Sequence, residues 1–180
     1  MPYIEPSMRS VEILDRAGSM PALAARITAC VAEGLFARPL VVRGAAAALI
    51  NRAVARPGQL CFPIDAVMAC LRDTTAGRDV EQHAVALGAA AEKMAAERAV
   101  SVDGLLNYLL TRLMHVCYPS PRYHDFNEII GVFDSLLAHC DADDMLVRGV
   151  LRCCQMEYYR KHAAPYEDAK EREHGAVARD

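Results

Sequence analysis

The chain has 180 residues, of which 53% are apolar and 24% charged, a composition that supports an ordinary packed core. Its formal charge of −3 excludes the strongly basic surface that binding to a nucleic-acid backbone requires, so no nucleic-acid partner is expected. No apolar run approaches the length of a membrane span, and the opening MPYIEPSMRS lacks the pattern of a signal peptide. We therefore expect a cytoplasmic protein without a membrane partner.

Helical patterning runs through the whole chain, because Ala and Leu are abundant and no stretch alternates for long at period two. In the first hundred residues, the segments FARPLVVRG (36–44) and TTAGRD (74–79) are predicted to be a loop and a linker. Helices are expected over about 10–17, 19–35, 45–55, 57–73 and 81–99.

The second half has sharper helix signals. Ser101 is placed to cap a helix with a leucine stripe, and a second helix is expected from about Tyr123. Asp141 is predicted to cap a long final helix that ends at Pro165 and leaves a charged, fraying tail. The fold class is therefore all-α, a bundle of about seven or eight helices with a C-terminal three-helix core.

Two regions are expected, 1–100 and 101–180, joined in one compact unit. PGQLCFPIDAVM and DGLLNYLLTRLM both begin helices, and each is followed by a helix with an internal glycine, Gly88 or Gly131. A duplicated helical hairpin would explain this echo. Gly131 and Gly149 are interpreted as points of close helix–helix approach.

The cysteines are expected to be free thiols, because they form no C-x-x-C pair and most stand among apolar residues. They are Cys30, Cys61, Cys70, Cys117, Cys140, Cys153 and Cys154.

Several short motifs occur in a fixed order: MPYIEPSMR at the start, DGLLNYLLTRLM (103–114), NEIIGVF (127–133), GVLRCCQMEYYRK (149–161) and APYEDAKEREHGAV (164–177). Together they resemble a family of small uncharacterised proteins from tailed phages and bacteria, whose pattern includes P-G-E-L-N-Y, Y-R-R and P-Y-E-D. The resemblance covers the first ten residues and the chain from about 100 to the end. It implies a phage or prophage origin and no assigned activity.

This sequence departs from the family pattern at several positions. Val102 and Asp103 replace the proline of the first motif, and Arg152 and Gln155 replace a glutamate and a lysine. The final N-G-D-V is here HGAV, at 174–177.

Two polar stripes are the main candidates for a binding surface. Tyr108, Thr111, Arg112 and His115 follow helical spacing opposite the leucines, and a second stripe runs through Arg148, Arg152, Gln155 and Tyr159. On the same last helix, Glu157 and Lys161 are spaced for an i,i+4 ion pair, and Tyr158 is expected to face the core with Cys154. Tyr and Arg are enriched in interfaces and anion sites. The predicted binding residues are Asn107, Tyr108, Thr111, Arg112, Gln155, Glu157, Tyr159, Arg160, Tyr166, Glu167 and Asp168.

No nucleophile elbow, phosphate loop or dinucleotide fingerprint occurs, so no catalytic residue and no cofactor are predicted. The favoured interpretation is a non-enzymatic, phage-type binding protein, homo-oligomeric, with a host protein or a small anionic, nucleotide-like molecule as its ligand. The alternative is a metal-dependent helical phosphohydrolase that uses His115, His124 and Asp125, because His124-Asp125 is the dipeptide of such sites.

The leucine stripe and the polar stripe are expected to respond differently to truncation. Leu109→Ala and Leu151→Ala should lower the free energy of unfolding by roughly 2–5 kcal/mol, because each removes buried volume. Arg112→Ala and Tyr159→Ala should change it by no more than about 0.5 kcal/mol while weakening assembly or binding. Chemical denaturation of the four variants measures the contrast. An Arg112→Ala loss as large as that of Leu109→Ala would make the polar stripe structural.

Overall fold

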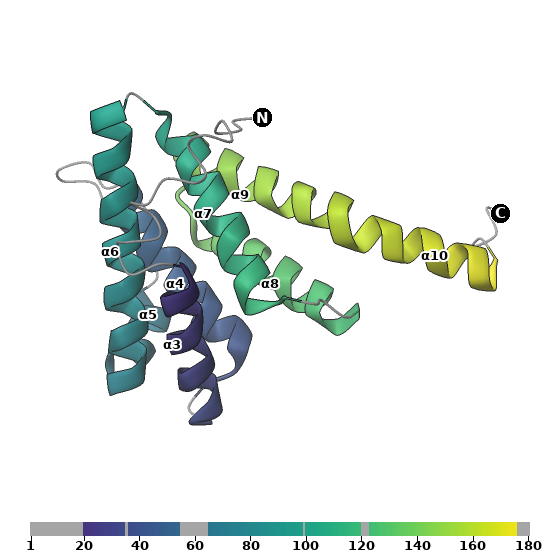
Figure 1. Ribbon diagram of the computed structural model, residues 1–180, viewed down its shortest axis with the longest axis horizontal. Helices are drawn as coiled ribbons and strands as arrows, with labels where there is room; N and C mark the ends of the chain where they lie inside the picture. Colours follow the sequence, from purple (N-terminus) through teal and green to yellow (C-terminus); the bar gives the residue numbers. More distant parts are fainter. Residues whose placement is uncertain (1–19, 35, 55–64, 99, 120–122, 176–180) are drawn as a thin grey trace.

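The computed structural model describes residues 20–34, 36–54, 65–98, 100–119 and 123–175, and all regular secondary structure within them is helical (Figure 1). The all-α prediction is confirmed. The expected helix at 10–17, the start of the helix expected at 57, and Cys61 lie outside the described residues. The elements are α3 (Met20–Ala32), α4 (Arg38–Ala53), α5 (Asp65–Arg72), α6 (Thr75–Arg98), α7 (Val102–Cys117), α8 (Tyr123–His139), α9 (Met145–Tyr158), the π-helix η1 (Tyr159–Ala163) and α10 (Ala164–His174).

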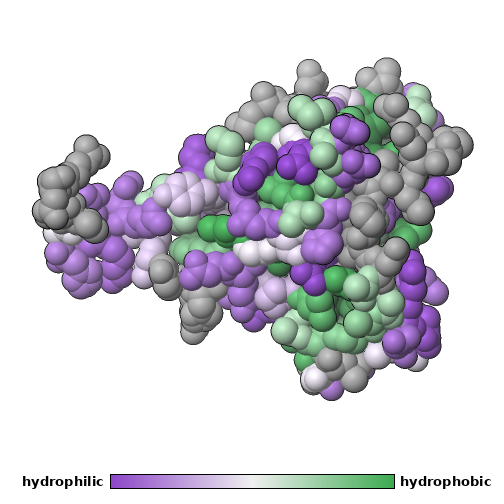
Figure 2. Space-filling model, turned by 180° about the vertical axis from the view of Figure 1, so that it is seen from behind, coloured by the Kyte–Doolittle hydropathy of each residue, from purple (hydrophilic) through white to green (hydrophobic). Residues whose placement is uncertain are grey.

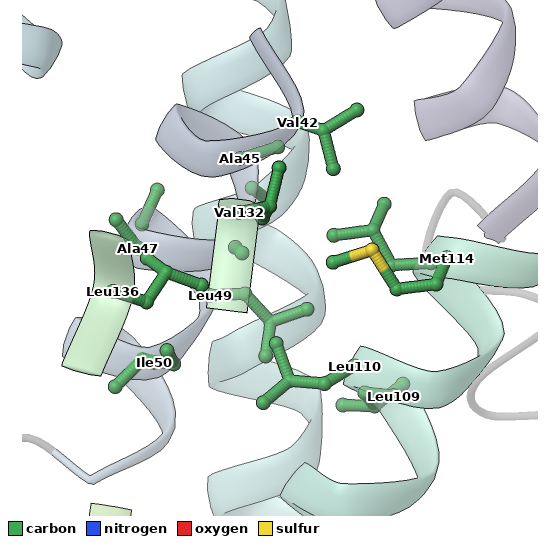
Figure 3. Close-up of a cluster of buried hydrophobic side chains, with 14 of the residues drawn as sticks. Val42, Ala45, Ala47, Leu49, Ile50, Leu109, Leu110, Met114, Val132 and Leu136 are labelled. Atoms are coloured by element: carbon green, nitrogen blue, oxygen red, sulfur yellow. The ribbon is translucent and has the colours of Figure 1, made fainter. Parts of the chain in front are cut away.

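Helix α4 is the centre of the bundle. It contacts α3, α5, α6, α7 and α8, and nearly every residue from Val41 to Ile50 is buried. A helix that is apolar all round belongs in a core, and its run of alanines keeps it thin enough for neighbours on every side. Figure 3 shows α4 side chains beside Leu110 and Met114 of α7 and beside Val132 and Leu136 of α8.

Glycines allow the closest approaches to this centre. A Cβ on Gly88 of α6 would lie 2.7 Å from the Cβ of Arg52 and 2.7 Å from the carbonyl oxygen of Leu49. A Cβ on Gly44 would meet the side chain of Leu71 of α5 at 2.1 Å. At Gly88 the neighbour is the α4 backbone, so close packing of α6 on α4 requires glycine, whereas at Gly44 the neighbours are side chains of α5.

The prediction for the other two glycines is wrong. A Cβ on Gly131 or Gly149 would meet nothing within 4 Å, and both residues are exposed. Neither marks a close helix contact within this chain.

Two predicted breaks turn out to be helical. The loop expected at 36–44 contains the start of α4 at Arg38, because Pro39 fits the first turn of a helix and Val41 and Val42 face the core. The linker expected at 74–79 is nearly all α6. Thr74 starts that helix by accepting a hydrogen bond from the Gly77 N–H at its Oγ1, at 3.0 Å.

The C-terminal helices share the core of α4 rather than forming one of their own. Both α7 and α8 pack on α4, and α9 packs on α7 and α8. The Ser101 cap of α7 is confirmed, since its hydroxyl accepts from the Gly104 N–H. The cap of α9 is Asp144, which accepts from the Val147 N–H at 3.0 Å, and Asp141 instead forms a turn with the Asp143 N–H.

The prediction that Pro165 ends the last helix is also wrong. The chain passes from α9 through the π-turn η1 into α10, and α10 extends away from the bundle as an arm (Figure 1). In the π-turn the Ala164 N–H bonds back to the Tyr159 carbonyl, five residues earlier. This register accommodates the missing N–H of Pro165 in the first turn of α10, so the helix axis continues. The tail expected to fray is helical as far as His174.

Within the described ranges, no helix combines the length and the apolar character needed to cross a bilayer.

The glycine contacts make a paired prediction. Gly88→Ala should destabilise the protein by about 1–3 kcal/mol, because the new methyl group overlaps the α4 backbone. Gly131→Ala is the matched control. It should stabilise by up to about 1 kcal/mol, because alanine is the better helix former and open space surrounds that position. Thermal and urea unfolding measure both, and equal effects of the two substitutions would contradict the packing.

Candidate functional site

Helix α9 has two apolar faces, of which the bundle uses one. Its inner face buries Val147, Val150, Leu151, Cys154 and Tyr158, which confirms the inward orientation predicted for Tyr158 and Cys154.

The outer face of α9 follows the spacing i, i+4, i+8 and i+11 through Met145, Gly149, Cys153 and Met156. Met145 is 77% exposed and Met156 69% exposed. Among the described residues, four of the five exposed large hydrophobic side chains lie on α9 or in the π-turn: Met145, Leu146, Met156 and Tyr159. This concentration makes the outer face of α9 the unusual surface of the molecule.

An open groove of about 580 Å³ lies along this surface, a volume in the range of ligand and peptide pockets. Most of its lining is apolar, and the polar groups stand near the π-turn. The described residues that line it are Ile130, Cys153, Gln155, Met156, Glu157, Tyr159 and Arg160.

Glu157 organises the charges at one end of the groove. The residue is only 9% exposed, and its carboxylate accepts from the Arg160 guanidinium at 3.1 Å and pairs with the Lys161 ammonium at 2.8 Å. The predicted i,i+4 pair of Glu157 and Lys161 is therefore confirmed. Hydrogen bonds from Arg160 and Lys161 lower the pKa of the Glu157 carboxyl.

The start of the α10 arm is held by two contacts. The Tyr166 ring lies edge-on to Phe126 of α8, with 5.8 Å between centroids, and the Tyr159 hydroxyl donates to the Glu167 carboxylate. Beyond this point α10 buries no residue. In Figure 2, where the arm points to the left, its surface is hydrophilic.

The π-turn also brings two histidines together. The Nε2 atoms of His115 on α7 and His162 in η1 lie 3.3 Å apart, and the Tyr158 ring packs against His162 with 4.7 Å between centroids. Burial lowers the pKa of both imidazoles, and for His115 the facing His162 lowers it further. Burial therefore favours the neutral form of both rings.

The predicted binding residues fall into three groups. Gln155, Glu157, Tyr159 and Arg160 line the groove together, and Tyr166, Glu167 and Asp168 follow them on α10. The α7 residues lie elsewhere: the Thr111 hydroxyl donates to Cys154 Sγ at 3.7 Å, and Cys154 Sγ donates to the Asn107 carbonyl at 3.6 Å.

The two stripes face different neighbours. Cys154 is the α9 residue that contacts Thr111, whereas the Gln155 amide donates to Asp134 of α8 at 2.9 Å. Tyr108 is half-buried against the core and Arg112 is exposed on α7. Thr111 is thus tied to the inner face of α9, and Gln155 to α8.

The residues of the alternative metal site have other surroundings. Asp125 pairs with Arg38 at 3.7 Å, His115 faces His162, and the side chain of His124 lies outside the described residues. Among the described residues, no group of three or more His, Cys, Asp or Glu could hold a metal ion.

Sequence reasoning missed the outer stripe of α9 and His162. The helical spacing of Met145, Gly149, Cys153 and Met156 was a readable signal. The approach of His162 to His115, 47 positions away, left no local pattern.

A family model described as "Domain of unknown function (DUF6899)" matches residues 143–177. The matched segment contains α9, the π-turn and α10, and with them the charged end of the groove and all of its described lining except Ile130. The chain is similar to that domain over about a fifth of its length. Searches of curated proteins and of solved structures found no match.

The lowered pKa of Glu157 predicts an acid-dependent loss of stability. A carboxyl with a lowered folded-state pKa stabilises the fold above its unfolded pKa, about 4.3, and loses that contribution as the pH falls through the folded value. At pH 7, Glu157→Gln should therefore destabilise the protein by about 1 kcal/mol and lower its melting temperature. Below about pH 4, the melting temperatures of the variant and the wild type should come closer together.

Glu97→Gln is the control, because Glu97 is exposed and pairs only loosely with Lys93, at 3.7 Å. Melting curves from pH 3 to 7 compare the three proteins. If the melting temperature of Glu157→Gln differs from that of the wild type by the same amount at every pH, the charge of the Glu157 carboxylate does not contribute to stability.

Proposed function

We propose that this chain is a non-enzymatic, phage-type interaction protein that assembles with further copies of itself through the outer face of α9 and the α10 arm. The observation that carries the proposal is the second apolar face of α9. A helix with apolar residues on both faces normally has a partner on each, and the bundle supplies only one.

Gly149 supports a helical partner on this face. An exposed glycine inside a helix costs up to about 1 kcal/mol relative to alanine. Among the described residues nothing lies within 4 Å of a Cβ at Gly149, so the described packing gives no reason for a glycine there. Gly88 allows α6 to pack closely on α4 within the chain. In the same way, Gly149 would allow a helix of another molecule to pack closely on α9.

Charge complementarity favours a second copy as that molecule. From 145 to 163 the helix carries four basic side chains, Arg148, Arg152, Arg160 and Lys161, against the single acid Glu157. From 164 to 174 it carries four acids, Glu167, Asp168, Glu171 and Glu173, against Lys170 and Arg172. Antiparallel pairing of two such helices would place the acidic arm of each copy beside the basic segment of the other.

The form of the arm agrees with this arrangement. The described residues of α10 contact little beyond the π-turn and the ring of Phe126, and an 11-residue polar helix is marginal in water without packing. A second copy would supply the missing packing surface.

For the further ligand we propose a host protein rather than a small anion. The groove is mainly apolar, and methionine surfaces adapt to peptide side chains. The resemblance to phage proteins supports a role in the host cytoplasm.

Self-association can be tested with one substitution in the outer stripe. Met156→Asp should convert an oligomer into a monomer, because it places a charge in the apolar contact while touching no core residue. Val85→Asp is the matched control, since Val85 is an exposed hydrophobic residue on α6, away from α9. Light scattering over a concentration series measures the mass of all three proteins.

The control should keep the mass of the wild type. Added salt should weaken the assembly, because paired surface charges are screened. A wild type that is monomeric at the highest concentration would contradict the proposal. A thermal-shift response to nucleotides would assign the groove to anions instead of a host protein.

A further inference from the structure

The His115–His162 pair lies apart from the groove, at the junction of α7 with the π-turn. The 3.3 Å between the two Nε2 atoms is longer than an ordinary hydrogen bond from N–H to oxygen, 2.7–3.2 Å. In tetrahedral zinc sites the Zn–N distance is about 2.0–2.1 Å, which places two ligand nitrogens about 3.3–3.4 Å apart. The observed spacing of 3.3 Å fits two ligands to one metal ion, and it also fits an N–H to N hydrogen bond between the rings.

We propose that His115 and His162 chelate a transition-metal ion of the Zn²⁺ class through their Nε2 atoms. Imidazole ligands suit Zn²⁺, Cu²⁺ and Ni²⁺, whereas Mg²⁺ and Ca²⁺ require oxygen ligands. Because no third His, Cys, Asp or Glu joins the pair among the described residues, water fills the remaining positions.

The fold holds both rings in place. His162 belongs to the π-turn, a feature that often marks functional positions in helices. Tyr158 packs against His162, and its centroid lies 6.2 Å from that of His115. The two imidazole planes are nearly perpendicular, at 83°, so the rings do not stack, and their Nε2 atoms are the atoms that approach each other.

The surrounding charges are compatible with a cation. Two positive groups act on His115, Lys161 and Arg112. The Lys161 ammonium is turned to the Glu157 carboxylate at 2.8 Å, and Arg112 is exposed to solvent.

Titration calorimetry with ZnCl₂ tests the site on the full chain, freed of metal by a chelator and kept reduced. We expect one saturable site per chain. His115→Asn and His162→Asn should each weaken binding at least about tenfold, a loss that removal of even an outer-shell partner can cause. His139→Asn is the matched control, because His139 is exposed on α8 and bonds its own helix at the Ser135 carbonyl.

Titration with Co²⁺ provides the second measurement, since its visible spectrum distinguishes nitrogen from thiolate ligands. The described chain has six free cysteines, so sulfur-to-metal absorption that persists in both histidine variants would overturn the proposal. The proposal would also be overturned if Zn²⁺ binding did not saturate, or if all variants bound Zn²⁺ equally well. The two histidines would then only form a hydrogen bond with each other. Circular dichroism of the variants separates loss of a ligand from loss of fold. None of these outcomes depends on self-association, so the interaction proposal is tested separately.

Discussion

The fold depends on the small side chains of α4, the central helix. A central helix can contact five others only if its side chains are small, because each larger residue would push a neighbour outward. The alanines at 45–48 and Gly44 provide that narrow surface, and Gly88 brings α6 against the α4 backbone at Leu49 and Arg52. The core of this protein is therefore set by backbone proximity more than by large interlocking side chains.

This arrangement decides which surfaces remain for function. Positions around α4 are taken by α3, α5, α6, α7 and α8, so α9 packs on the second layer, over α7 and α8. A helix in that position buries one face, and its other face is open to solvent or to another molecule. The outer stripe of α9 and the arm that continues it thus follow from the crowding at the centre.

The sequence predicted correctly those features that depend on residues close together in the chain. The helical class, the Ser101 cap and the Glu157–Lys161 pair each depend on residues within one or two turns. The failures share a different cause. The start of α4 was decided by burial of Val41 and Val42 against distant helices, and the continuation past Pro165 required a π-turn that no propensity reports. The histidine pair joins two helices 47 positions apart, which only the tertiary structure reveals.

The π-turn connects the separate features of the C-terminal half. It adds the register change that lets the chain pass Pro165, it directs α10 away from the bundle, and it places His162 against α7. Tyr158 and Glu157 flank it on the inside, and Tyr159 links it to Glu167 on the arm. One change of helical register therefore decides both the direction in which the arm leaves the bundle and the point at which the chain meets His115 of α7.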